Sequence, residues 1–138
     1  MASLIYNSAV DDMSRGAIDF DTDTFKVLLV TNSYSPNKDT HDKRSHLSHE
    51  VSGTGYTAGG VTSACTVTKD TANDRVTLQF ASVSWASSTI TARGAVIYKS
   101  RGGAASQDEL VAYNDFGADV STTAGTFSIA ASTITLQN

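Results

Sequence analysis

The chain has 138 residues, a formal net charge of −4 and a single cysteine, Cys65. This length fits one domain in which folding buries roughly two thirds of the surface of the unfolded chain, and the acidic balance argues against a duplex nucleic-acid partner, which usually requires a clustered basic surface. One cysteine excludes an intrachain disulfide and a zinc site built from cysteines of this chain alone.

The N-terminal segment, residues 1–20, predicts a short helix. Ser3 is placed to cap a helix over residues 4–15, in which apolar side chains recur at helical spacing, and Gly16 would end it. The segment lacks a basic start and a long apolar run, so we expect no secretory signal. No stretch of the chain approaches the length of a membrane span, and we expect no membrane partner.

A buried strand and a long loop are predicted next. The segment FKVLLV, residues 25–30, is almost continuously apolar and predicts a central strand covered on both faces. Residues 31–60 hold the only proline, the three histidines and the glycines of GTGYTAGG, and they predict a long loop. A short strand around residues 45–51 could interrupt it. Connections longer than about 15 residues are unusual inside a domain and tend to be functional or partly structured.

From residue 61 onward the sequence predicts strand after strand. Residues 61–69 are followed by the turn DTAND and by residues 75–80, where Val76, Leu78 and Phe80 alternate with polar residues and should face the core. Further strands are predicted at residues 83–85, 89–91, 95–99, 109–113, 126–130 and 133–136, with a loop over residues 100–108. Many short strands separated by turns predict an all-β fold, a jelly-roll-like β-sandwich of one domain over residues 1–138 with a short N-terminal helix.

Two side chains in these strands deserve separate interpretation. Cys65 lies in an alternating run and is expected as a small strand residue, because no histidine stands at a spacing typical of a thiol nucleophile. Trp85, like Tyr98, could offer a platform on which a sugar stacks. Trp85 could equally be a core side chain whose indole N–H bonds to the backbone.

The histidines His41, His46 and His49 lie in one loop with several acidic residues. Such a set could supply nitrogen and oxygen ligands to a metal, but the spacing matches neither HExxH nor a zinc signature, and the segment is polar enough to be solvated. The acid pairs along the chain are adjacent in sequence and are typical of surface charge. We therefore expect no metal, no cofactor, no small-molecule substrate, no catalytic residue and no enzyme activity.

The succession GAIDFDTDTFKVLLV, VSGTGYTAGG, TITARGAVIYKSRGG and ELVAYNDFG resembles small virion proteins of tailed bacteriophages. Within that group the chain is most similar to capsid cement, or decoration, proteins. The resemblance implies a jelly-roll-like β fold on the outside of the icosahedral shell, after synthesis in the host cytoplasm. It also implies a homodimer or homotrimer that binds the major capsid protein where its subunits meet and reinforces the shell against the pressure of packaged DNA. It supplies no catalytic residue.

Small β proteins also occur in phage tails and fibres. The alternative is therefore a tail or fibre module that binds glycans on the host surface. Such a module would place Tyr34, Tyr56 and Trp85 on an exposed face, and it would usually form a trimer.

A cement protein needs a rigid body with adhesive strand edges or arms. The segments that could serve are residues 1–6, the loop 32–60 and the last strand, 133–137. Each could instead be ordinary structure: a frayed end, a solvated loop and an edge strand. The candidate interface residues are Ser3, Leu4, Ile5, Tyr6, Tyr34, Tyr56, Ile134 and Leu136.

Overall fold

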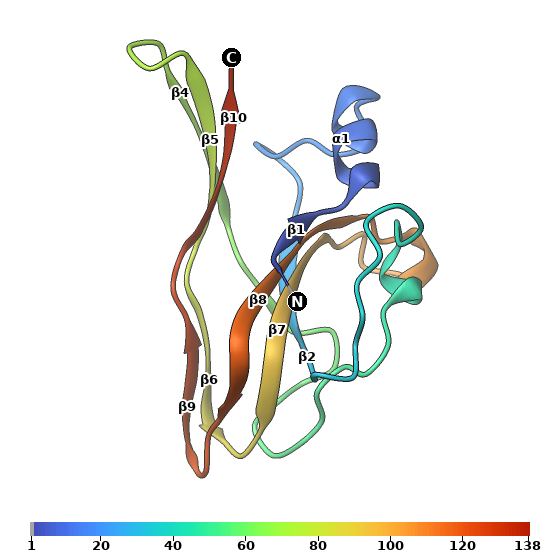
Figure 1. Cartoon of the computed structure of the whole chain (residues 1–138), viewed down its shortest axis with the longest axis vertical. Helices are drawn as coiled ribbons and strands as arrows, with labels where there is room; N and C mark the ends of the chain where they lie inside the picture. Colours follow the sequence, from blue (N-terminus) through green and yellow to red (C-terminus); the bar gives the residue numbers. More distant parts are fainter. Residues whose placement is uncertain (1) are drawn as a thin grey trace.

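Ten strands in three antiparallel sheets and one α-helix make up the structure, a computed structural model that describes residues 2–138. The sheets pack as a sandwich, so the predicted all-β, single-domain fold with a short N-terminal helix is confirmed (Figure 1). The elements in chain order are β1 (Leu4–Ile5), α1 (Asn7–Ser14), β2 (Phe25–Val30), the 3-10 turn η1 (Arg44–His46), β3 (Val61–Thr62), β4 (Cys65–Asp70), β5 (Arg75–Phe80), β6 (Val83–Ser88), β7 (Thr91–Lys99), the 3-10 turn η2 (Ala105–Gln107), β8 (Leu110–Ser121), β9 (Gly125–Ile129) and β10 (Ser132–Gln137).

The first layer is a five-stranded sheet in the order β1-β8-β7-β2-β3. Strand β2 has the bounds that its apolar run predicts. Val27 and Leu29 point into one core, whereas Leu28 and Val30 point into a second core on the opposite face of the sheet. The prediction of a strand covered on both faces is therefore confirmed.

The second layer is a long antiparallel ribbon. Strand β5 leads into β6, and β9 leads into β10, so the sheets β10-β5-β4 and β6-β9 follow one another along the same ribbon (Figure 1). The pairing is interrupted between two residue pairs, Phe80 with Ser132 on one side and Val83 with Ile129 on the other. We call the part beyond this interruption, strands β4, β5 and β10, the arm. In Figure 1 the arm extends past the five-stranded sheet on the side where α1 lies.

The main core fills the space between the five-stranded sheet and the ribbon. Phe80 of the arm packs edge-on against Phe25 of the sheet, with ring centroids 5.5 Å apart. Leu78 is buried beside it and Val76 is partly buried, so the predicted inward face of β5 is confirmed. Trp85 is also a core residue, but its indole N–H finds no hydrogen-bond partner within residues 2–138, so the predicted bond to the backbone is wrong.

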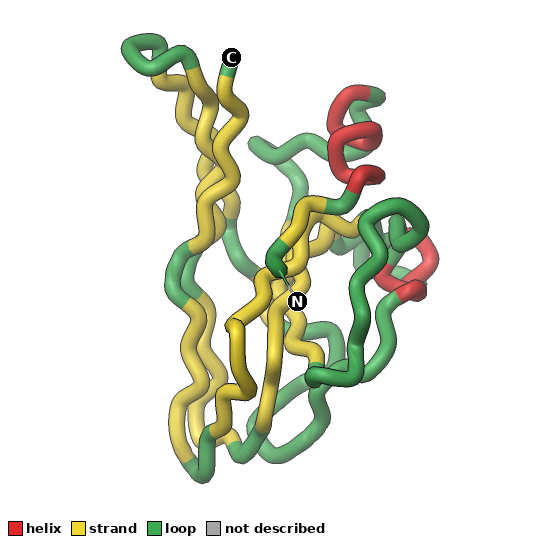
Figure 2. Tube along the Cα trace, in the orientation of Figure 1, coloured by secondary structure: helices red, strands yellow, loops and turns green. Residues whose placement is uncertain are grey.

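The first part of the segment 31–60 forms a third layer on the outer face of the five-stranded sheet, drawn mostly as loop in Figure 2, whereas Val51 and Tyr56 pack against the main core. Its residues Tyr34 and Leu47 pack against the second core, which is rich in tyrosine. The strand predicted around residues 45–51 is wrong. His49 has a left-handed backbone (φ 58°), which breaks an extended run, and only Glu50 bridges to β2, at Val30.

The predicted start of the N-terminal helix is also wrong. Leu4 and Ile5 pair with β8 as strand β1, because this pairing satisfies their backbone groups, and the helix begins at Asn7. Ser3 caps no helix: its hydroxyl accepts the Asp115 N–H at 2.8 Å. The helix ends as predicted, with Gly16 in the left-handed region (φ 78°).

The predicted strand over residues 61–69 is two strands in two different sheets. Strand β3 closes the five-stranded sheet, and β4 belongs to the arm. Between them Ser63 is buried and donates its hydroxyl to the Ala81 carbonyl at 2.7 Å, while its N–H bonds to the Phe25 carbonyl. This serine fastens the chain where it crosses from one layer to the other. Conversely, residues 89–91 and 95–99 do not form separate strands, because Thr91–Lys99 is continuous as β7.

Candidate functional site

Two free strand edges flank one open groove. Strand β1 is an outer strand of the five-stranded sheet, and β10 is an outer strand of the arm. The groove between them has a volume of about 770 Å³. An outer strand presents unpaired backbone N–H and C=O groups, which can pair with another polypeptide. The residues that line the groove are Ser3, Leu4 and Ile5 from the β1 side, Ser132, Thr133, Ile134 and Thr135 from β10, Ile97, Ala112, Tyr113 and Asn114 from β7 and β8, and Lys38.

Strand β1 is held against β8 by a short ladder that extends one residue past the strand. Leu4 lies opposite Tyr113 and Ile5 lies opposite Ala112 in the ladder with β8. The N–H of Tyr6 continues this ladder with a 3.1 Å bond to the Val111 carbonyl. Leu4 therefore packs toward the second core, while Ile5 remains 42% exposed on the groove side.

The free edge of β10 can be assigned from one terminal hydrogen bond. The Asn138 N–H donates to the Asp74 carbonyl at 3.0 Å, continuing the β10–β5 ladder. Backbone groups in an antiparallel pair point toward the partner at every second residue. The even-numbered residues of β10 therefore bond to β5, and Thr133, Thr135 and Gln137 direct their N–H and C=O groups away from the sheet.

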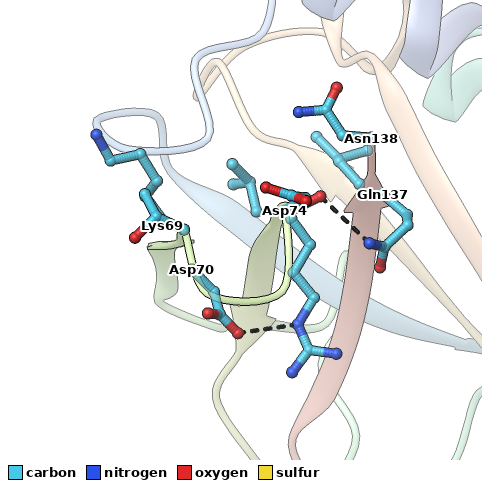
Figure 3. A pocket seen from close by; sticks show the side chains of 9 residues that line it. Lys69, Asp70, Asp74, Gln137 and Asn138 are labelled. Atoms are coloured by element: carbon cyan, nitrogen blue, oxygen red, sulfur yellow. Dashed lines mark hydrogen bonds and ion pairs between the residues drawn. The ribbon is translucent and has the colours of Figure 1, made fainter.

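The end of β10 is fixed at the tip of the arm (Figure 3). The side chain of Gln137 donates to the Asn73 carbonyl at 2.7 Å and to the Asp74 carbonyl at 3.2 Å. Nearby, Arg75 pairs with Asp70 across the β4–β5 turn at 3.2 Å. These contacts line a shallow depression of about 380 Å³ and hold the last strand straight against β5.

Exposed apolar side chains gather between α1 and the arm. Ile5, Val10 (53% exposed) and Leu136 (37% exposed) line one small cavity of about 30 Å³, together with Met13 and Ile134. They are three of the four large apolar side chains that are exposed among residues 2–138. Such a concentration is typical of an interaction surface, whereas isolated exposed apolar residues are ordinary.

Most of the predicted interface residues meet at this place. Ser3, Leu4, Ile5 and Ile134 line the groove, and Leu136 lines the adjoining cavity. The three tyrosines lie elsewhere, and the sequence gives no signal that separates them from surface tyrosines.

Tyr6 and Tyr34 are buried in the second core, where their hydroxyls are 2.9 Å apart, so their prediction as surface contacts is wrong. They are buried because the segment 31–60 closes over the outer face of the sheet. Tyr56 is partly buried, donates to the Glu50 carboxylate at 2.8 Å and accepts the Leu29 N–H at 3.1 Å. It fastens the loop to β2.

The aromatic side chains considered as sugar platforms are inside the protein. Trp85 packs edge-on against Phe127, with centroids 6.1 Å apart. Tyr98 is buried and donates to the Gly59 carbonyl. Burial raises the pKa of Tyr98 to about 12. None of these faces is available for stacking in this conformation.

The three histidines have separate partners. His41 Nδ1 lies 2.9 Å from the Tyr34 hydroxyl, His46 Nδ1 lies 2.9 Å from Asp42, and His49 Nδ1 lies 3.0 Å from the Ser48 hydroxyl. Burial, with a smaller effect of His46, holds the pKa of His41 below its usual range. Within the described residues no three His, Cys, Asp or Glu side chains are grouped so that they could hold a metal ion.

Cys65 lies in β4 and packs partly against the main core, as its alternating pattern predicts. Burial raises the pKa of its thiol to about 11. A thiol that stays protonated at neutral pH is a weak nucleophile.

A buried ionic cluster, for which the sequence has no local signature, fastens the loop after β7. Arg101 binds the buried Glu109 carboxylate through two nitrogens, at 2.6 and 2.8 Å, and Arg44 binds the buried Asp108 at 2.7 Å. Burial alone would raise the pKa of Glu109, but the bonds from Arg101 and the nearby Lys43 hold it below its usual range. The cluster joins the segment 31–60 to the loop 100–109 and so has a structural role. Opposite charges far apart in sequence gave no signal for it.

Comparison with family models, with curated proteins and with solved structures found no match to this chain. In the part of the chain that the structure describes, no helix has the length and apolar character needed to cross a membrane.

Proposed function

We propose that this protein is a structural virion protein that binds the outside of a tailed-phage capsid and cements major capsid subunits together. The observation that carries the proposal is the pair of free strand edges, β1 and β10, that flank a groove beside exposed apolar side chains. The resemblance of the sequence to cement proteins supports the major capsid protein as the partner.

The chemistry of the groove suits adhesion. A strand or arm of a capsid subunit that entered it would pair with the free backbone groups of β1 and cover Ile5, which is exposed beside the groove. Each contact of this kind is modest, but a shell offers many equivalent positions, and a homodimer or homotrimer engages several of them at once. The two cores and the fastened tip of the arm keep the edges in fixed positions, so binding orders few side chains.

The test is co-sedimentation of the purified protein with undecorated capsids assembled from the major capsid protein of the same phage. We expect saturable binding at a fixed ratio to the capsid subunits. Ile5→Glu should weaken binding at least tenfold, because it places a charge in the groove. Val120→Glu is the matched control, since Val120, on β8, is 43% exposed but does not line the groove. It should bind as the unmodified protein does.

Absence of co-sedimentation, combined with binding to host-cell glycans, would overturn the proposal in favour of a tail or fibre module. Equal loss of binding in both glutamate variants would show that the groove is not the contact. The burial of Tyr34 and Trp85 already leaves the glycan alternative without the aromatic platforms it would use.

A further inference from the structure

Strand β10 is an unprotected edge. Natural proteins usually protect a free edge with charged side chains, proline or a bulge. The sequence STITLQ of β10 contains no charged residue and no proline, and its ladder with β5 is regular over Ser132–Gln137. The other outer strand of the arm, β4, ends in Lys69 and Asp70. The arm therefore has one protected edge and one edge suited to pairing.

The two faces of β10 differ in chemistry. Ile134 and Leu136 point toward the cavity beside α1. Thr133, Thr135 and Gln137 alternate with them on the other face and direct their backbone groups to the free edge. A strand that pairs here must therefore supply apolar side chains on one face only.

We infer that the strand that pairs with β10 is β10 of a second copy of this chain, antiparallel and centred on Thr135. An antiparallel strand pair can have twofold symmetry, so one edge can serve both copies. In this register Thr135 lies opposite Thr135 of the second copy, and Ile134 lies opposite Leu136. The arms of two copies then form one continuous six-stranded sheet.

The register follows from the apolar side chains. Centring the pair on Thr133 would place Ile134 opposite Ser132, and centring it on Ile134 would place Leu136 opposite Ser132. Centring it on Leu136 or Gln137 would set an apolar side chain opposite Asn138. Only the register centred on Thr135 pairs both Ile134 and Leu136 with apolar partners, and apolar cross-strand pairs are the stabilising ones.

Charge also favours a second copy as the occupant. Two chains that each carry a net charge of −4 repel one another unless they meet through a neutral surface. Strand β10 is neutral along its whole length, and among residues 2–138 Lys38 is the one charged residue that lines the groove. Pairing would also cover Leu136, which is 37% exposed in the single chain. This inference does not depend on the capsid as a partner.

The first test is the mass of the full-length protein in solution by light scattering. We expect twice the 14.5 kDa of one chain. Thr135→Pro removes an N–H that points away from β5 at the free edge, a change that an edge strand tolerates. It should weaken the dimer at least tenfold. Lys69→Pro is the control on the opposite edge, where the N–H also points outward, and it should leave the dimer intact. Thermal melting establishes that both variants are folded.

The second test fixes the register by disulfide cross-linking in a Cys65→Ser background. Thr135→Cys should form an intermolecular disulfide under mild oxidation, because the two cysteines lie opposite each other. Thr133→Cys should not, because its two copies would be four residues apart along the strands, about 13 Å, beyond the reach of a disulfide. This test decides the question even if Thr135→Pro fails to fold.

The inference is overturned if the unmodified protein is monomeric at 100 µM or if the Thr133→Cys cross-link forms as readily as the Thr135→Cys one. A mass of three or more copies would also overturn it, since that result indicates pairing of β10 with a different edge, such as β4 of the next copy. Capsid binding measured on the same variants separates the two proposals, because a monomeric protein can still bind capsids.

Discussion

Leu78→Ala tests whether the arm is bound to the body through the main core. Leu78 lies in the middle strand of the arm, opposite Val67 of β4 and Ile134 of β10. It is only 3% exposed, and it borders the small cavity beside α1. Truncation therefore removes packing at the point where all three strands of the arm meet the five-stranded sheet and the helix.

The expected loss can be worked from these surroundings. The substitution removes three carbon atoms, a transfer free energy of about 2.4 kcal/mol at roughly 0.8 kcal/mol per methylene. The vacated space adds about 24 cal/mol for each Å³ that the neighbours do not refill. It would join an existing cavity of about 30 Å³ that Ile134 and Leu136 of the arm also line, and we expect these side chains to refill part of the space. We therefore expect a total loss of about 3 kcal/mol, inside the range of about 2 to 5 kcal/mol for buried leucines.

The assay is equilibrium unfolding in urea followed by tryptophan fluorescence, since Trp85 is buried in the same core. With a slope of about 1.5 to 3 kcal/mol/M, the midpoint should fall by roughly 1 to 2 M. Gln79→Ala, the next residue of β5 on the exposed face, is the control and should shift the midpoint little. Equal midpoints for the two variants would refute the assigned facing of β5.

Three further predictions concern single groups. Arg101→Ala leaves the buried Glu109 carboxylate without its bidentate partner, and urea unfolding should show a loss of about 1 to 3 kcal/mol in the free energy of unfolding. Arg101→Lys should recover part of this loss. No loss in Arg101→Ala would mean that water replaces the guanidinium. The pKa of His41 is lowered in the folded protein, so the unfolded chain binds more protons than the folded one below about pH 6.5. The free energy of unfolding should therefore fall as the pH drops from about 6.5 through the pKa of the folded state. An equally steep fall in His41→Gln would contradict this. Cys65, with a pKa of about 11, should react with iodoacetamide at pH 8 roughly 100 times more slowly than an ordinary thiol, and unfolding should abolish the difference.

The strands with strong local patterns could be predicted from the sequence. The apolar run FKVLLV and the alternating run RVTLQF have the predicted bounds and facings. Each pattern reflects the surroundings of a single strand: a continuous apolar run where both faces are covered, and alternation where one face is. The weak pattern SHLSHEV predicts a strand that does not form, because the left-handed backbone of His49 interrupts the extended run.

Strand pairing could not be predicted in the same way. Ser63 gives no local sign that β3 and β4 belong to different sheets, because the alternation passes through it unchanged. The tyrosines of the segment 31–60 likewise carry no sign of whether they face water or the sheet. Burial of Tyr34 depends on the shape of a surface built from strands distant in sequence, and this long-range geometry is what the sequence leaves open.

The groove itself follows from where one side chain is buried. Tyr6 enters the second core directly after β1, so the chain leaves the five-stranded sheet after Ile5 and turns into α1 at Asn7. A longer β1 would have continued along the outer edge of β8 toward its start. Instead, the short helix stands beside the arm and leaves Val10 exposed there. The open edge of β10 is thus coupled to the tyrosine core on the opposite face of the sheet, and substitutions at Tyr6 should alter self-association even though Tyr6 lies outside the groove.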